Sequence, residues 1–195
     1  MVEFLKKDIR IYQRAIKKYL PNKINYLFIL ESPPYPKKGV LSFFYLLSTP
    51  PKQSTLFKLF MRALYGKKFT NNDDKNYWLS KFKNDGFFLI DAVEYPINKD
   101  IDGNNLSDDE YIRRLEIRKN CRNLLEILKK LNKKNIITND TKLILIKKCV
   151  FEELYTFLNN EGFNVIDKKV NYPNQYDYNF IKDIHWLVYR KYFKY

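Results

Sequence analysis

The chain is 195 residues long, and 45% of its residues are hydrophobic and 17% aromatic. That is enough apolar material for one good core but hardly for two, so we expect a single domain over residues 1–195. The 36 basic and 22 acidic side chains leave a formal net charge of +14, which favours a polyanion such as DNA as the partner. A generally lysine-rich composition is the alternative explanation of this charge.

Several common classes of protein are disfavoured by what the chain lacks. Two cysteines are too few for a disulfide framework or a four-thiolate cluster, and a single histidine argues against a multi-histidine metal site. There is no glycine-rich phosphate loop, so we expect no metal and no cofactor. No apolar stretch approaches the roughly 20 residues that span a bilayer, and the amphipathic, charged first segment leads us to expect no signal peptide. We expect a cytoplasmic monomer without a membrane partner.

Helical and strand patterns alternate through the first half of the chain. Apolar residues at steps of three or four predict an amphipathic helix with a basic face over residues 2–20. The apolar run at 26–30 is bounded by prolines and suits a buried parallel strand. Two helices are predicted at 54–65 and 73–85, each followed by a glycine, and a second buried strand at 87–93.

The second half continues the alternation. Ser107 and Glu110 form a capping box that opens a long helix. Further elements are predicted in the order strand 143–146, helix 150–160, strand 163–166 and helix 177–192. This order predicts an α/β protein with three α/β/α layers around a central, mainly parallel sheet of four strands. The long helix carries a basic face that is either merely solvated or grips phosphates, made up of Arg113, Arg114, Arg118, Arg122, Lys129 and Lys130.

Glu31 is the first candidate for chemistry, because it leaves a buried strand at the edge where open α/β sheets bind ligands. No basic residue follows it until Lys37, which predicts a raised pKa and an ability to accept a proton or orient a water. A carboxylate that only caps a helix or braces a loop is the alternative. Ser32 and the two prolines after it fix the backbone of the loop, as a preorganised site requires.

Aromatic and polar residues follow on the same connection and after the second strand. Residues 43–45 are three consecutive aromatics, among them Phe44 and Tyr45, and they cannot all point the same way. We therefore expect at least one of them to face the crevice and stack on a base. Asp91 and Asn98 stand at and beyond the end of the second strand. His185 and Cys149 lie at apolar helical spacing, and we expect both to be structural, with proton transfer as the alternative role of His185.

Residues 30–34, Leu-Glu-Ser-Pro-Pro, resemble the G-E-x-P-G first motif of the uracil-DNA glycosylase superfamily. Phe44 follows Glu31 at about the distance of the aromatic that stacks on the flipped base in that family. The strand that ends at Asp91 is similar to the one whose end supplies the base-reading asparagine, and residues 172–174 fall where the H-P-S motif would follow the last strand. The resemblance covers most of the chain.

The resemblance implies a glycosylase-like fold and a role in base-excision DNA repair. A basic face would hold DNA, a nucleotide would be extruded, and Glu31 would position water for hydrolysis of the N-glycosidic bond of a damaged base. Because Tyr172 stands in place of the motif histidine, Lys147 or Asn174 would stabilise the leaving base. The implied site comprises Glu31 and Asn174 as catalytic residues, and Ser32, Phe44, Tyr45, Asp91, Asn98, Lys147, Tyr172 and Pro173 as base-binding residues.

Two other classes of function are kept open. The same crevice is compatible with a nucleic-acid- or nucleotide-binding module that has lost catalysis, in which Tyr172 marks a retired catalytic position. An enzyme that acts on a free small molecule with Glu31 as its base is the third possibility, and it leaves the net charge unexplained.

Overall fold

The computed structural model describes residues 2–35, 42–70, 72–97, 110–173 and 177–190. Within them lie six α-helices, one short 3-10 helix and three strands. In chain order they are α1 (Val2–Lys18), β1 (Tyr26–Leu30), η1 (Pro51–Gln53), α2 (Thr55–Tyr65), α3 (Lys75–Asn84), β2 (Phe87–Asp91), α4 (Glu110–Lys133), β3 (Lys142–Leu145), α5 (Lys148–Asn160) and α6 (Tyr178–Tyr189). The predicted start of α4 at Ser107 lies outside the described residues.

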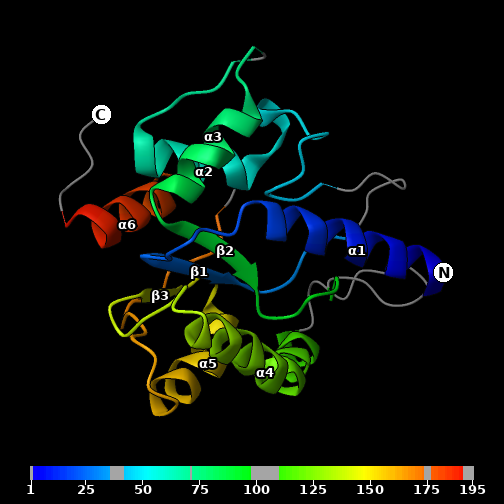
Figure 1. Ribbon diagram of the computed structural model, residues 1–195, viewed down its shortest axis with the longest axis vertical. Coiled ribbons are helices and arrows are strands. Elements are labelled where there is room, and N and C mark those ends of the chain that lie inside the picture. Colours follow the sequence, from blue (N-terminus) through cyan, green and yellow to red (C-terminus); the bar gives the residue numbers. More distant parts are fainter. Residues whose placement is uncertain (1, 36–41, 71, 98–109, 174–176, 191–195) are drawn as a thin grey trace.

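The sheet is parallel, with strand order β2-β1-β3. Figure 1 shows α2, α3 and α6 on one side of the sheet and α4 and α5 on the other, so helices cover both faces. The chain moves from β1 to β2 on one flank and then crosses to β3 on the other flank. The direction of winding therefore reverses at β1, and such a reversal opens a crevice at the carboxyl ends of the strands.

The prediction of four strands is wrong within the described residues. The segment predicted as the last strand, 163–166, forms only one isolated parallel bridge, Val165 with Leu143, and a second bridge, Val170 with Ile146, lies beyond its predicted end. Between the bridges lies the charged run 167–169, which interrupts the apolar pattern that a buried strand needs. The segment still runs beside β3 but does not extend the sheet as a regular strand.

The core is built from the strands and the aromatic faces of the helices. Phe28 of β1 is fully buried, and its ring packs against Phe60 of α2 and Phe82 of α3, with ring centroids 4.8 and 6.2 Å away. Burying one such side chain contributes about 1.5 to 3 kcal/mol. All five residues of β2 are buried, as expected for a parallel strand covered on both faces.

Two local features hold β2 in place at the edge of this sheet, a pair of side-chain hydrogen bonds and a glycine turn. The hydroxyl of Tyr45 accepts a hydrogen bond from the Leu89 amide at 2.8 Å and donates one to the Leu89 carbonyl at 3.1 Å, in place of a neighbouring strand. Gly86, which precedes β2, has φ +78°, and a Cβ there would lie 2.3 Å from the side chain of Asn25. Only glycine fits this turn, and the turn aligns β2 with β1.

Candidate functional site

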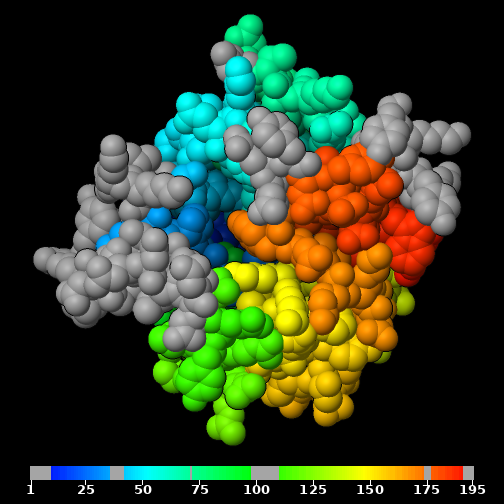
Figure 2. All heavy atoms as spheres, turned by 180° about the vertical axis from the view of Figure 1, so that it is seen from behind, coloured from blue at the N-terminus to red at the C-terminus, as the bar shows by residue number. Residues whose placement is uncertain are grey.

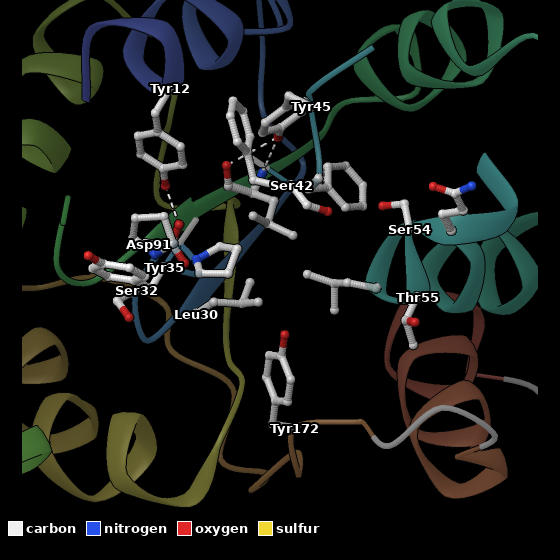
Figure 3. Close-up of a pocket in the computed structure, with 17 residues that line it drawn as sticks. Tyr12, Leu30, Ser32, Tyr35, Ser42, Tyr45, Ser54, Thr55, Asp91 and Tyr172 are labelled. Carbon is white, nitrogen blue, oxygen red and sulfur yellow. Dashed lines mark hydrogen bonds between the residues drawn. The ribbon is translucent and has the colours of Figure 1, made fainter. Parts of the chain in front are cut away.

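A cavity of about 470 Å³ lies at the carboxyl ends of β1 and β2, within the usual size range of small-molecule pockets. Leu30 and Asp91 form its floor at the strand ends, and Tyr12 of α1 reaches it from the side. The segments 32–35, 42–45 and 53–56 and the side chain of Tyr172 complete the wall. In Figure 3, Tyr172 directs its hydroxyl into the cavity from the side opposite Tyr12 and Tyr45.

The cavity belongs to a hollowed face of the molecule. Figure 2 shows a hollow bordered by blue, yellow and orange surface, the colours of the N-terminal part of the chain, α5 and the segment after β3. The first of these parts carries Ser32 and the last carries Tyr172, and both residues line the cavity. The site is therefore assembled from segments far apart in the sequence.

Asp91 is the buried carboxylate of this cavity, with 8% of its surface exposed. The hydroxyl of Tyr12 donates a short hydrogen bond to its Oδ2 atom. Burial raises the pKa of Asp91 to about 7, the Tyr12 hydrogen bond opposes this rise, and the charge of Glu31 adds to it. Asp91 therefore changes its protonation state near neutral pH and can act as donor or acceptor.

Glu31 has a different environment. Its Oε2 atom accepts a hydrogen bond from Lys147 Nζ at 2.5 Å, and its Oε1 atom accepts one from Cys149 Sγ at 3.2 Å. The Nε atom of Arg113 lies 3.8 Å from Oε1. The expectation that Glu31 has no basic neighbour is therefore wrong, because residues distant in sequence bring two cations to it. Only 8% of Glu31 is exposed, and it is not among the residues that line the cavity.

Lys147 reaches Glu31 from a strained backbone. It is the residue before α5 and has φ +95°, a value that non-glycine residues rarely adopt. Its amide donates a hydrogen bond to the Val170 carbonyl at 2.7 Å, which fixes this conformation. Its Nζ atom also lies 6.0 Å from the centre of the Tyr172 ring. Lys147 therefore lies between Glu31 and Tyr172 of the cavity wall. Backbone strain of this kind is found preferentially at functional sites.

Cys149 is a core residue, as expected. It is buried, and burial followed by the charge of Glu31 raises the pKa of its thiol to about 12. The thiol stays protonated and donates to Glu31, which argues against a role as a nucleophile. His185 is partly buried, and its Nδ1 atom lies 2.8 Å from the Ala63 carbonyl oxygen.

Phe44 and Tyr45 line the cavity but are also parts of the core. Phe44 is 4% exposed, and its ring is in contact with the rings of Phe57, Phe60 and Phe82. Little of its surface is left for stacking on a base. Burial raises the pKa of Tyr45 far above its usual value, so its hydroxyl remains the neutral partner of β2.

Tyr172 is half-exposed and stands at the rim of the cavity. Its hydroxyl points into the cavity (Figure 3), and the burial of this group, together with the charges of Asp91 and Glu31, raises its pKa to about 12. The hydroxyl is therefore a neutral hydrogen-bond donor at physiological pH. Ser32 also lines the cavity, whereas Pro173 is buried and absent from its wall. Asn98 and Asn174 lie outside the described residues.

Two residues that shape the site were not predicted as site residues. Tyr12 falls among the apolar residues of the first predicted helix, although a buried tyrosine hydroxyl usually needs a partner such as Asp91. Arg113 was grouped with the exposed basic face. Its position beside Glu31 could not be inferred, because it depends on how α4 packs against the start of α5.

Much of the predicted basic face of α4 is neutralised within the molecule. Arg114 pairs with Glu110, Glu152 and Glu153, Arg118 pairs with Glu153, and Lys129 pairs with Glu161 at 2.9 Å. Except for the Arg114–Glu110 pair within α4, these pairs connect α4 to α5 or to Glu161, the residue after it. A surface that grips phosphates would therefore have to draw on other cations, such as the exposed residues Arg10, Arg14, Lys17 and Lys18 of α1.

The described helices include none long and apolar enough to cross a membrane. Of the motif residues, Leu30, Ser32, Asp91 and Tyr172 line the cavity, whereas Glu31 and Pro173 do not. Comparison of the chain with models of protein families, with curated proteins and with solved structures gives no match.

Proposed function

We propose that this protein binds DNA, takes one extruded base into the cavity and hydrolyses the N-glycosidic bond of a damaged base, uracil or a deaminated purine. The cavity at the sheet edge, with a carboxyl group on one side and a tyrosine hydroxyl on the other, is the observation that carries this proposal. The motif resemblance to the uracil-DNA glycosylase superfamily supports it, and a divergent form of that fold is part of the proposal. A base needs hydrogen bonds at its edge and apolar walls at its faces, and the cavity offers both.

The two carboxylates, Glu31 and Asp91, have separate roles in the proposed reaction. Glu31 orients a water whose oxygen forms a bond to the sugar C1′ while the bond from C1′ to the base nitrogen breaks. The electron pair leaves with the base, and the water proton passes to Glu31. Asp91 binds the base edge, and the hydroxyl of Tyr172 donates a hydrogen bond to the departing base. One contact of Glu31, to Lys147 or Cys149, must give way to the water.

A second candidate, a base-binding module without hydrolysis, rests on the state of Glu31. Both of its oxygens are occupied by neighbouring side chains, and the residue does not line the cavity. In this alternative Glu31 is a structural anchor for the loop that forms the wall, and the cavity captures a base without breaking a bond.

The two candidates are separated by Glu31→Gln, measured on oligonucleotides that carry uracil, hypoxanthine, xanthine or an alkylated base. Abasic-site formation is read as alkali-labile cleavage, and binding is measured at several salt concentrations. We expect the wild type to release at least one base and Glu31→Gln to bind equally well without releasing it. Glu126→Gln, which changes an exposed carboxylate of α4, is the matched control.

Each outcome favours one function. Salt-dependent binding without release of any base supports the module. Equal release by the wild type and Glu31→Gln removes Glu31 from the mechanism. Absence of salt-dependent binding rejects both candidates in favour of an enzyme that acts on a free small molecule.

A further inference from the structure

The Tyr12–Asp91 pair gives one oxygen of the cavity a defined role. Tyr12 comes from the face of α1 that packs toward the sheet, and its hydroxyl donates to Asp91 Oδ2. Burial and the nearby carboxylates raise the pKa of Tyr12 well above its usual value, so this hydroxyl keeps its proton and stays a donor. Among the described residues, Asp91 Oδ1 has no hydrogen-bond partner, and Asp91 lines the cavity. One carboxyl oxygen is thus committed, and the other is open to a ligand.

The hydrogen bond from Tyr12 determines which oxygen of Asp91 carries the proton when the carboxyl group is neutral. While the Tyr12 hydroxyl donates to Oδ2, the proton of neutral Asp91 is placed on Oδ1. Neutral Asp91 therefore presents a donor to the ligand, and ionised Asp91 presents an acceptor at the same atom. A carboxyl group without a fixed partner would be free to offer either oxygen in either role.

Deamination changes whether one edge of a base donates or accepts a hydrogen bond. It replaces an exocyclic amino group, which donates, by a carbonyl group, which accepts. We propose that Asp91, oriented by Tyr12, binds the carbonyl of a deaminated base when neutral and the amino group of the parent base when ionised, so that the preference between them reverses with pH. This inference rests on the proposed binding of a base in the cavity. It narrows the substrate class to deaminated bases, such as uracil and hypoxanthine, whose carbonyl group is bound by the neutral form.

The groups that face Asp91 favour its neutral form. Tyr12 approaches from α1, Tyr45 from the segment before η1, and Tyr172 from the segment after β3, and all three are neutral. Glu31 at the end of β1 contributes a negative charge, and Glu94 lies beyond β2 on the Tyr12 side. No lysine or arginine of the described chain forms an ion pair with Asp91. With a pKa of about 7, Asp91 exchanges its two forms within the range of an ordinary binding assay.

The test uses a short DNA strand in which one base is flanked only by stable abasic sites. Dissociation constants are measured by fluorescence anisotropy from pH 5.5 to 8.0 at constant ionic strength, for hypoxanthine, for adenine and for a strand without any base. We expect hypoxanthine to bind more tightly at low pH. The ratio of its dissociation constant to that of adenine should rise roughly tenfold across this range, the worth of one charge-assisted hydrogen bond.

Three variants connect the result to the pair. In Asp91→Asn the amide oxygen accepts from Tyr12 and the amide nitrogen faces the ligand, so hypoxanthine should be preferred at every pH. Tyr12→Phe removes the hydrogen bond that holds the pKa of Asp91 down, and the midpoint of the pH profile should move upward. Tyr19→Phe is the matched control, because the Tyr19 hydroxyl donates to Asn76 and does not line the cavity.

The outcomes separate this inference from the proposed function. A ratio that is constant with pH in the wild type, or a pH-dependent ratio that survives in Asp91→Asn, overturns the role of Asp91 while base binding stands. Equal affinity for strands with and without a base rejects base capture itself. If the midpoint of the pH profile is the same in Tyr12→Phe as in the wild type, Tyr12 does not orient Asp91. That result overturns the proposal that the Tyr12–Asp91 pair selects the base.

Discussion

Two carboxylates stand at the ends of neighbouring strands, and the protein treats them in opposite ways. Glu31 ends β1 and is surrounded by Lys147, Arg113 and the thiol of Cys149. Asp91, which pairs with Leu30 across the sheet, ends β2 and has the hydroxyl of Tyr12 as its hydrogen-bond partner. One carboxylate is embedded among cations, and the other among neutral tyrosines in a low-dielectric pocket.

This difference shows how one sheet edge can hold two acids with separate roles. Nearby cations favour a charged carboxylate, whereas burial without a cation favours a neutral one. Pairs of titratable groups with contrasting environments are the usual basis of a division between acid and base. Here the division follows from which segments reach each strand end, since both carboxylates are 8% exposed.

The largest effect is expected from removing the carboxylate among the cations. Glu31→Ala should lower the free energy of unfolding by about 3 to 5 kcal/mol, because it leaves two partly buried cations, Lys147 and Arg113, without the carboxylate that they share. Urea unfolding at pH 7 measures this. Glu126→Ala, on the exposed face of α4, should change the value by less than about 0.5 kcal/mol. Equal stability of both variants would show that the cations of the site do not need Glu31.

The next effect concerns the carboxylate among the tyrosines. The pKa of Asp91 is raised from 3.8 unfolded to about 7 folded, so the folded state binds more protons between these values. The contribution of Asp91 to stability is therefore full below pH 3.8 and is lost as pH rises through 7.

Asp91→Asn cannot titrate and should lack this loss. Its stability relative to the wild type should rise by about 2 to 4 kcal/mol between pH 4 and pH 8 in urea titrations. Other groups that titrate in this range are common to both proteins and cancel in the difference. A difference that is flat with pH contradicts the buried, neutral state of Asp91.

The sequence predicts the strands and most helices because the signals are local. The apolar runs at β1 and β2 are as long as a buried strand needs, and Gly66 ends α2 in the left-handed conformation that glycine favours. The positions of Glu31 and Asp91 follow from the parallel order alone, since carboxyl ends of parallel strands meet at one edge.

The partners of these carboxylates could not be predicted. Lys147 is 116 residues from Glu31 and reaches it only through an unusual backbone conformation. Tyr12 is 79 residues from Asp91 on a helix whose packing direction the sequence leaves open. The fourth strand was predicted from apolar residues, and the charged residues that follow prevent a regular ladder. Local pattern thus locates the strand ends, and tertiary packing decides the chemistry of each.

A smaller effect isolates the strain at Lys147 from its ion pair. Lys147→Ala and Lys147→Gly both remove the amine beside Glu31, but only glycine adopts φ +95° without strain. Lys147→Gly should therefore be more stable than Lys147→Ala by about 1 kcal/mol in urea unfolding. The same pair of substitutions at Thr156, an exposed position inside α5, should show the opposite order, because glycine weakens a helix relative to alanine. If the glycine and alanine variants have the same order of stability at both positions, the strained geometry of Lys147 is contradicted.

The smallest effect measures whether the two carboxylates influence each other. The charge of Glu31 contributes to the raised pKa of Asp91, after burial. Glu31→Gln removes that charge with little change of shape and should lower the pKa of Asp91 by a fraction of one unit, about 1 kcal/mol or less. The measurement is an NMR titration of the Asp91 carboxyl carbon, with Glu126→Gln as control. If the pKa of Asp91 is the same in all three proteins, burial and the Tyr12 hydrogen bond set it, and the two sites at this edge act independently. A lowered value in Glu31→Gln means that protonation of Glu31 during hydrolysis would also shift Asp91 toward its ionised form, linking the bond-breaking step to loss of the donor that holds the deaminated base.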